Sequence, residues 1–207
     1  AGMYYEALAR RSDHAGELFR LAGDARLQAG QYPSALQDFR LAAYEAPGYE
    51  PGVDAGWAAV VLLREGITGE RVSAGFEPDL AGLTAEADRF TEHYGSDGRV
   101  PGLLADVATR WLEAGNNDQA LRYAKQAVTH QQAMPETRYA GWVVTAQVRQ
   151  HTEEHSLAER AWREALTLAS KDAANSEMKA DVAGLNEQLA IAIYRQGEQA
   201  AAAGKAT

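Results

Sequence analysis

Small residues recur at fixed offsets along this chain of 207 residues, and this pattern constrains the fold more than any other feature. In the first series, Gly23 is followed at offsets of seven, two, three, four and three by Gly30, Tyr32, Ala35, Phe39 and Ala42. The offsets recur in Ala108, Gly115, Asn117, Ala120, Ala124, Ala127, in Ala146, Glu153, His155, Ala158, Trp162, Ala165, and, cut short, in Ala190, Gly197, Gln199, Ala202. Residues three and four apart share one helix face, so each series predicts two helices joined near its second member.

The residues around the first series have physical reasons for their positions. A small residue at Gly23 lets two helices approach closely, and Gly30 suits a helix end that needs a positive φ. Pro33 fits the first turn of a second helix, where no backbone donor is required. Pro47 ends that helix because its ring blocks continuation. This stretch is therefore predicted to form a helical hairpin.

The run AGDARLQAGQYPSALQDFRLAAYEAP, residues 22–47, resembles the tetratricopeptide repeat along its whole length. The resemblance implies an all-α fold, an α-solenoid of stacked antiparallel helix pairs, with residues 1–207 as one continuous solenoid. The expected repeats are about 16–49, 52–95 (divergent), 101–134, 139–172 and 183–207 (incomplete). The short last repeat and the absence of an initial Met predict a fragment of a larger bacterial protein of this family.

Apolar periodicity and helix breakers place helices at about 3–13, 16–29, 33–45, 53–65, 79–94, 101–114, 118–132, 136–150, 156–170 and 176–203. Gly66 stands where the divergent repeat would end its first helix. The offsets fail over 67–78, where we expect an exposed loop or short helix whose removal leaves folding intact. No strand pattern is present. The tryptophans are expected in the core: Trp57, Trp111, Trp142 and Trp162.

Charge and composition argue against several classes of function. The net charge is -9 and the basic residues are scattered, so neither nucleic acid nor an anionic membrane surface is an expected partner. The longest apolar run, 57–63, is far shorter than the roughly 20 residues of a membrane-spanning helix, so direct membrane insertion is not expected. With no cysteine, the chain has no disulfide, thiolate zinc site or cysteine nucleophile.

The resemblance also implies a binding surface, because in this family the first helix of each pair lines a concave groove. Carried onto this chain, the groove residues are Arg20, Asp24, Leu27, Gln28, Arg64, Leu112, Gln147, Gln150 and His151, with Glu17, Val60, Leu63, Ala105, Thr109, Glu113 and Val143 in a wider set. Arg and Gln side chains can hydrogen-bond a peptide, and the leucines can hold apolar anchors. Some family members grip a C-terminal carboxylate with a clamp that needs Asn where this chain has Asp24, so that specificity is not carried over.

These residues predict a protein-interaction scaffold that binds a peptide or protein partner in the groove and uses no cofactor. The alternative is a structural element of a larger repeat protein that associates with itself. The resemblance to bacterial repeat proteins of envelope complexes implies a periplasmic or outer-membrane-associated parent protein, with the cytoplasm as the alternative.

One short motif suggests a different function. His151, Thr152, Glu153, Glu154 and His155 fit the pattern H-x-x-E-H of one class of zinc peptidases, in which two histidines bind the metal and a glutamate acts as base. The segment falls at the expected turn between two helices, whereas a peptidase needs it inside a continuous helix. A zinc-dependent hydrolase is thus the least favoured function, and we expect polar turn residues, no metal site and no catalytic residue.

Overall fold

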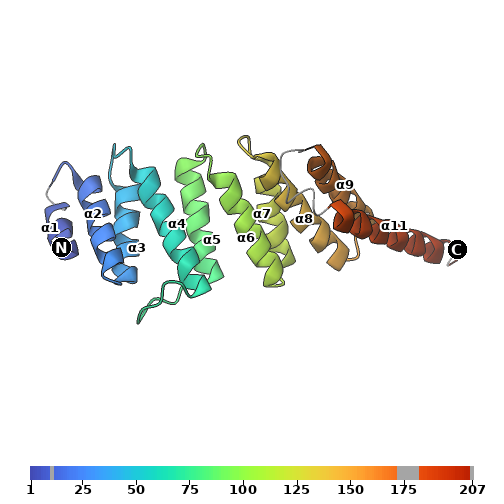
Figure 1. Cartoon of the computed structure of the whole chain (residues 1–207), viewed down its shortest axis with the longest axis horizontal. Coiled ribbons are helices and arrows are strands. Elements are labelled where there is room, and N and C mark those ends of the chain that lie inside the picture. Colours follow the sequence, from blue (N-terminus) through green and yellow to red (C-terminus); the bar gives the residue numbers. More distant parts are fainter. Residues whose placement is uncertain (10–11, 172–181, 206–207) are drawn as a thin grey trace. The chain divides into compact units, whose positions relative to one another are not determined.

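The computed structural model describes residues 1–9, 12–171 and 182–205. The chain is all-α and 79% helical, and the described part contains no strand beyond an isolated bridge between Ser73 and Phe76. The all-α prediction is confirmed. The helices fall into two compact units, Ala1–Gly95 and Ser96–Thr207 (Figure 1).

In the first unit each helix packs on the next helix in the chain. Its elements are α1 (Gly2–Ala9), α2 (Ala15–Gln28), α3 (Tyr32–Arg40), the π-helix η1 (Leu41–Glu45), α4 (Gly52–Thr68) and α5 (Leu80–Tyr94). The expected helix 33–45 is thus α3 continued by η1, a change of helical type that the sequence pattern did not predict. Of the expected helix 3–13, α1 covers residues up to Ala9, residues 10–11 lie outside the described part, and residues 12–13 are not helical.

The contact between α2 and α3 confirms the packing that was predicted from the first series. A Cβ atom added at Gly23 would lie 2.6 Å from Cε1 of Phe39, so only glycine allows this ring to lie against α2. Ala35 and Ala42 are completely buried on the same side as Phe39. The helices approach closely because the residues between them are small.

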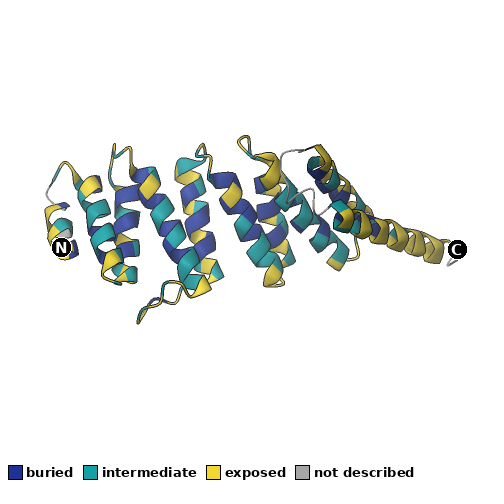
Figure 2. Cartoon of the chain, viewed as in Figure 1, coloured by how far each residue is buried: buried dark blue, intermediate teal, exposed yellow. Residues whose placement is uncertain are grey.

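The second unit is built in the same manner from α6 (Val100–Glu113), α7 (Asn117–Thr129), α8 (Pro135–His151), α9 (His155–Lys171) and α11 (Val182–Lys205). Neighbouring helices pack on one another, and α6 also packs on α8. Its predicted small residues are fully buried: Ala108, Ala120, Ala124, Ala127, Ala146, Ala158 and Ala165. Figure 2 shows the buried residues concentrated along the helix contacts.

Four helices, α2, α4, α6 and α8, end in the same Schellman motif. In each motif, a residue just past the end of the helix donates its N–H to the carbonyl five residues earlier. These hydrogen bonds, 2.8–2.9 Å long, run from Gln31 to Arg26, from Glu70 to Glu65, from Asn116 to Trp111 and from Glu154 to Arg149. The preceding residue has a positive φ in every case: Gly30, Gly69, Gly115 and Glu153. Three of these four turn positions were predicted from the offsets, and Glu153 adopts φ 59° although it is not glycine.

The turn at Gly69 corrects the sequence prediction for the divergent repeat. Helix α4 continues to Thr68 and ends at Gly69, one turn beyond Gly66. Gly66 instead makes room for the following loop, because a Cβ there would lie 2.4 Å from Cγ of Pro78 and 2.7 Å from Cε1 of Phe76. Residues 67 and 68 extend α4, and the rest of the segment 67–78 lies between α4 and α5 as expected. This part is only partly exposed, because Phe76 is buried against Tyr32 and α4.

The C-terminal helix corrects a second prediction. Helix α11 runs through Gly197 without a turn, so the hairpin expected in the incomplete repeat is wrong. Ala190 is exposed, whereas Leu185, Leu189 and Ala192 are buried against α8 and α9. The start of the expected helix 176–203 lies outside the described residues, and the helix they contain extends to Lys205.

Two ionic contacts inside the first unit were not predicted. Arg26 donates to Asp38 at 2.7 Å, and both side chains are buried. Glu86 is 1% exposed and accepts hydrogen bonds from Arg40 at 2.7 Å and from Tyr44 at 2.8 Å. Burial, together with the nearby Glu86 carboxylate, raises the pKa of Tyr44. These pairs join α2 to α3, and α5 to α3 and η1.

Candidate functional site

A pocket of about 340 Å³ lies between α8 and α11 in the second unit. It is lined by Val143, Gln147, Gln150, His151, Trp162, Gly184, Leu185 and Gln188. Three of the nine predicted groove residues, Gln147, Gln150 and His151, are therefore brought together here. They reach one pocket because positions three and four apart lie on the same face of α8.

Local sequence sets the register of α8, and so the direction of these side chains. Pro135 occupies the first turn, where a residue without a backbone donor is tolerated. The Schellman motif at Glu153 ends the helix just past His151. Along α8, Val144, Ala146 and Val148 are buried, whereas Gln147 and Gln150 are half-buried at the pocket.

The polar groups of the pocket form a short hydrogen-bonded chain. The indole N–H of Trp162 donates to Oε1 of Gln150 at 3.0 Å, and Nε2 of Gln150 donates to Oε1 of Gln188 at 3.2 Å. Gln150 is thereby held in one orientation between α9 and α11. In this bond Gln188 acts through its amide oxygen, so its amide nitrogen is a further donor group.

Gln147 lines the same pocket beside these hydrogen-bonded groups. Its whole side-chain amide is available for bonding, because the described residues include no hydrogen-bond partner for it. A primary amide both donates and accepts, so Gln147 and Gln188 can pair with the N–H and the C=O of a peptide backbone. The half-buried Val143 supplies apolar surface in the same lining, next to the buried Leu185. The pocket is suited to a short peptide segment with one apolar side chain.

The remaining predicted groove residues lie elsewhere. In the first unit, Arg20 forms an ion pair with Asp24 at 2.8 Å, with about two fifths of each side chain exposed. Arg20 also lines a depression of about 400 Å³ with Glu17, Tyr49, Pro51 and Asp54. Leu27, Gln28, Arg64 and Leu112 line neither this depression nor the α8–α11 pocket; Gln28 is exposed and the others are half-buried.

Two pocket residues were missed by the sequence reading. Trp162 was expected only as core, and its indole is indeed 3% exposed, yet its N–H positions Gln150. Gln188 was overlooked because the series starting at Ala190 was placed in the wrong register. The apolar residues Leu185, Leu189 and Ala192, at helical spacing, were the signal that could have given the correct face of α11.

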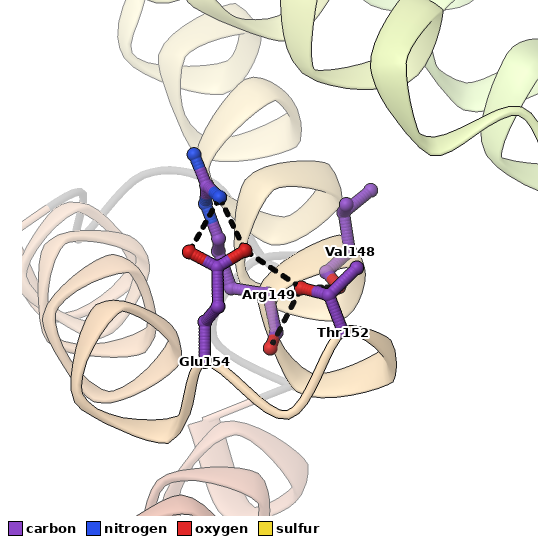
Figure 3. A network of polar contacts seen from close by, with 4 residues as sticks. All are labelled: Val148, Arg149, Thr152 and Glu154. Carbon is purple, nitrogen blue, oxygen red and sulfur yellow. Dashed lines mark hydrogen bonds and ion pairs between the residues drawn. The ribbon is translucent and has the colours of Figure 1, made fainter.

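The segment of the zinc-peptidase motif forms a turn, as the repeat pattern predicted. His151 is the last residue of α8 and His155 the first of α9. Arg149 donates to both carboxylate oxygens of Glu154 at 2.6 and 2.7 Å, and Thr152 donates to the same carboxylate (Figure 3). These hydrogen bonds, chiefly those from Arg149, lower the pKa of Glu154. Within the described residues, no group of three or more His, Asp or Glu side chains is placed to hold a metal ion.

Comparisons with known proteins add no family. A scan against protein-family models and a search of curated proteins both gave no match. Among the described helices, none is long and apolar enough to span a membrane. The pocket and its surroundings must therefore be interpreted from their own chemistry.

Proposed function

We propose that the chain is a tetratricopeptide-like repeat scaffold that binds an extended segment of a partner protein along the face of its first helices. The observation that carries this proposal is the α8–α11 pocket, where amide side chains line the surface that the repeat resemblance assigns to the groove. Supporting it, α2, α4, α6 and α8 all end in one motif, as first helices of successive pairs would. The α-solenoid arrangement is part of the same proposal.

In this function Gln147 and Gln188 bind the peptide backbone, while the half-buried Val143 contacts one apolar side chain. Gln150 does not bind the peptide directly, because its amide oxygen and nitrogen already form hydrogen bonds with Trp162 and Gln188. Its role is to position these two side chains. Backbone recognition by amides gives affinity with little dependence on sequence. The pocket thus suits a partner recognised by its extended shape and one apolar residue.

The test is to select binders from a displayed library of short random peptides and to measure their affinity by fluorescence anisotropy. The double variant Gln147→Ala, Gln188→Ala should weaken binding by about tenfold or more, since each lost hydrogen bond is worth about 0.5–1.5 kcal/mol. Gln126→Ala, on α7 and outside the pocket, is the matched control. If the selected peptides bind the double variant and the wild type equally, the pocket is not the binding site.

Self-association is a second candidate function, favoured by the exposed apolar side chains of α11. Ile193 is 43% and Tyr194 64% exposed, on the stretch of α11 that Figure 2 shows largely exposed. Sedimentation velocity over a range of concentrations distinguishes the two functions. A dimer that dissociates in the variant Ile193→Ser, Tyr194→Ser would assign this helix to assembly, and a concentration-independent monomer would exclude that assignment.

A further inference from the structure

A second recess lies on the opposite side of α8. Depressions of about 380 Å³ beside α7 and about 260 Å³ beside α9 share three α8 residues, Trp142, Thr145 and Arg149. Because both depressions contain these residues and both flanking helices pack on α8, they form one furrow with α8 as its floor. We call it the α7–α9 furrow.

The furrow is separate from the α8–α11 pocket, although both use α8. Thr145 and Gln147 are two positions apart, which places them about 200° apart around a helix. Arg149 and Gln147 are separated in the same way. A ligand in the furrow therefore does not occupy the pocket, and substitutions in one leave the lining of the other unchanged.

The walls and floor of the furrow are largely apolar. Leu121 and Val128 from α7 and Leu157 from α9 line it together with the half-buried indole of Trp142. Trp142 also packs against the core formed by α8, α9 and α11, which holds its indole in place. A cavity of about 150 Å³ can hold a benzene molecule, so each depression has room for a large apolar side chain.

Two cations flank this apolar surface, one on each wall. Lys125 of α7 and Arg160 of α9 are both exposed, and neither side chain has an ion pair or hydrogen bond within the described part of the chain. Arg149 on the floor is neutralised by Glu154 (Figure 3). Glu164 is the carboxylate present in the lining, so the charge available to a ligand is positive on a chain whose net charge is -9.

We propose that the α7–α9 furrow binds an acidic amphipathic segment of a partner protein. The apolar side chains of this segment occupy the two depressions, and the carboxylates of the segment pair with Lys125 and Arg160. Buried apolar anchors supply most of the affinity in such an interface, and the rim charges select the partner and speed its association.

The experiment uses the full chain and two short fluorescent helical peptides. Both carry leucines at helical spacing; one has Glu at the other positions and its counterpart has Lys. The Glu peptide should bind with an anisotropy change, and the Lys peptide should bind at least about tenfold more weakly. The variant Lys125→Glu, Arg160→Glu should reverse this preference, whereas Lys171→Glu, an exposed α9 cation outside the furrow, should leave it intact.

A substitution in the apolar wall tests the anchors. Leu157 is 37% exposed, so Leu157→Ser should fold normally and weaken the Glu peptide by about tenfold. Equal binding of both peptides, or full binding to the charge-reversed variant, would overturn the proposal. So would a self-associated chain that Leu157→Ser dissociates, because the occupant would then be a second copy. Variants of Gln147 and Gln188 affect the pocket alone, so failure here is distinguishable from failure of the proposed function.

Discussion

The two units fill their interiors in different ways. In the described residues, the buried charged side chains, Arg26, Asp38 and Glu86, all lie in the unit Ala1–Gly95, where they occur among aromatic rings such as Phe39 and Phe90. In the unit Ser96–Thr207 the buried side chains of the described residues are apolar or aromatic, and alanines such as Ala124 lie at the helix contacts. The first unit should therefore be sensitive to the loss of a charge partner, and the second to added volume.

The largest effect is expected in the first unit, from Asp38→Ala. Asp38 is 1% exposed and holds Arg26, so its removal leaves a buried guanidinium without its carboxylate. Breaking a buried pair in this way costs about 3–5 kcal/mol of unfolding free energy. Urea unfolding measures the change. Glu159→Ala, which breaks the exposed pair with Arg163, is the control, and an equal loss in both variants would contradict the comparison.

A smaller loss is expected in the second unit from Ala124→Leu. Ala124 is completely buried, and its carbonyl lies 3.0 Å from the position that a Cβ on Gly141 would occupy. Added methyl groups would push α7 and α8 apart, with a cost of about 1–3 kcal/mol. Ala200→Leu on the exposed part of α11 should have no such effect. An unchanged thermal melt for Ala124→Leu would show that this contact is not tightly packed.

A modest gain is expected from Glu153→Gly, which tests the turn shared by both units. Glu153 adopts the left-handed conformation that Gly30, Gly69 and Gly115 adopt at the other three turns. This conformation destabilises the fold by roughly 1–2 kcal/mol when the residue is not glycine. Glycine removes that cost, but its greater conformational freedom in the unfolded chain offsets part of the added stability. The variant should therefore be more stable by up to about 1 kcal/mol in a thermal melt, and any destabilisation would be evidence that the Glu153 side chain has a role of its own.

The smallest effect is expected from Glu154→Gln, a charge at the surface of the second unit. Hydrogen bonds from Arg149 and Thr152 lower the pKa of Glu154 from its ordinary value of 4.5. A carboxylate with a lowered pKa in the folded state stabilises the fold above its ordinary pKa, and that stability is lost as the pH falls through the lowered value. The variant should thus have a slightly shallower loss of stability in acid. Melts recorded between neutral and acidic pH would detect it, and identical pH profiles would contradict the ion pair.

The repeating offsets were sufficient to predict helices that pack on their neighbours in the chain and most of the turns between them. Gly30 and Gly115 could be placed because a left-handed helix end has few alternatives to glycine, and Ala35 and Ala124 because close helix contacts require small residues. Gly66 misled the prediction, since its lack of a side chain serves the contact with Phe76 and Pro78 and not a turn. The sequence pattern alone does not distinguish these two uses of glycine.

The candidate site was only partly predictable, for a related reason. Helical spacing along α8 was enough to group Gln147, Gln150 and His151, because residues on one helix keep a fixed relation. Their neighbours Trp162 and Gln188 come from other helices, and their approach depends on how α9 and α11 pack on α8. The α7–α9 furrow depends on the same packing, so no local pattern indicated it.

The sequence by itself determined local matters: an all-α chain, the helix ends at Gly30 and Gly115, the small residues at helix contacts and the polar turn after His151. Each of these follows from short-range spacing and backbone conformation. Only the tertiary structure decided that Asp38 and Glu86 are buried rather than solvated, and which side chains share a recess. Those outcomes depend on contacts between helices far apart in the chain, where the environment of a charge is set by the surface packed against it.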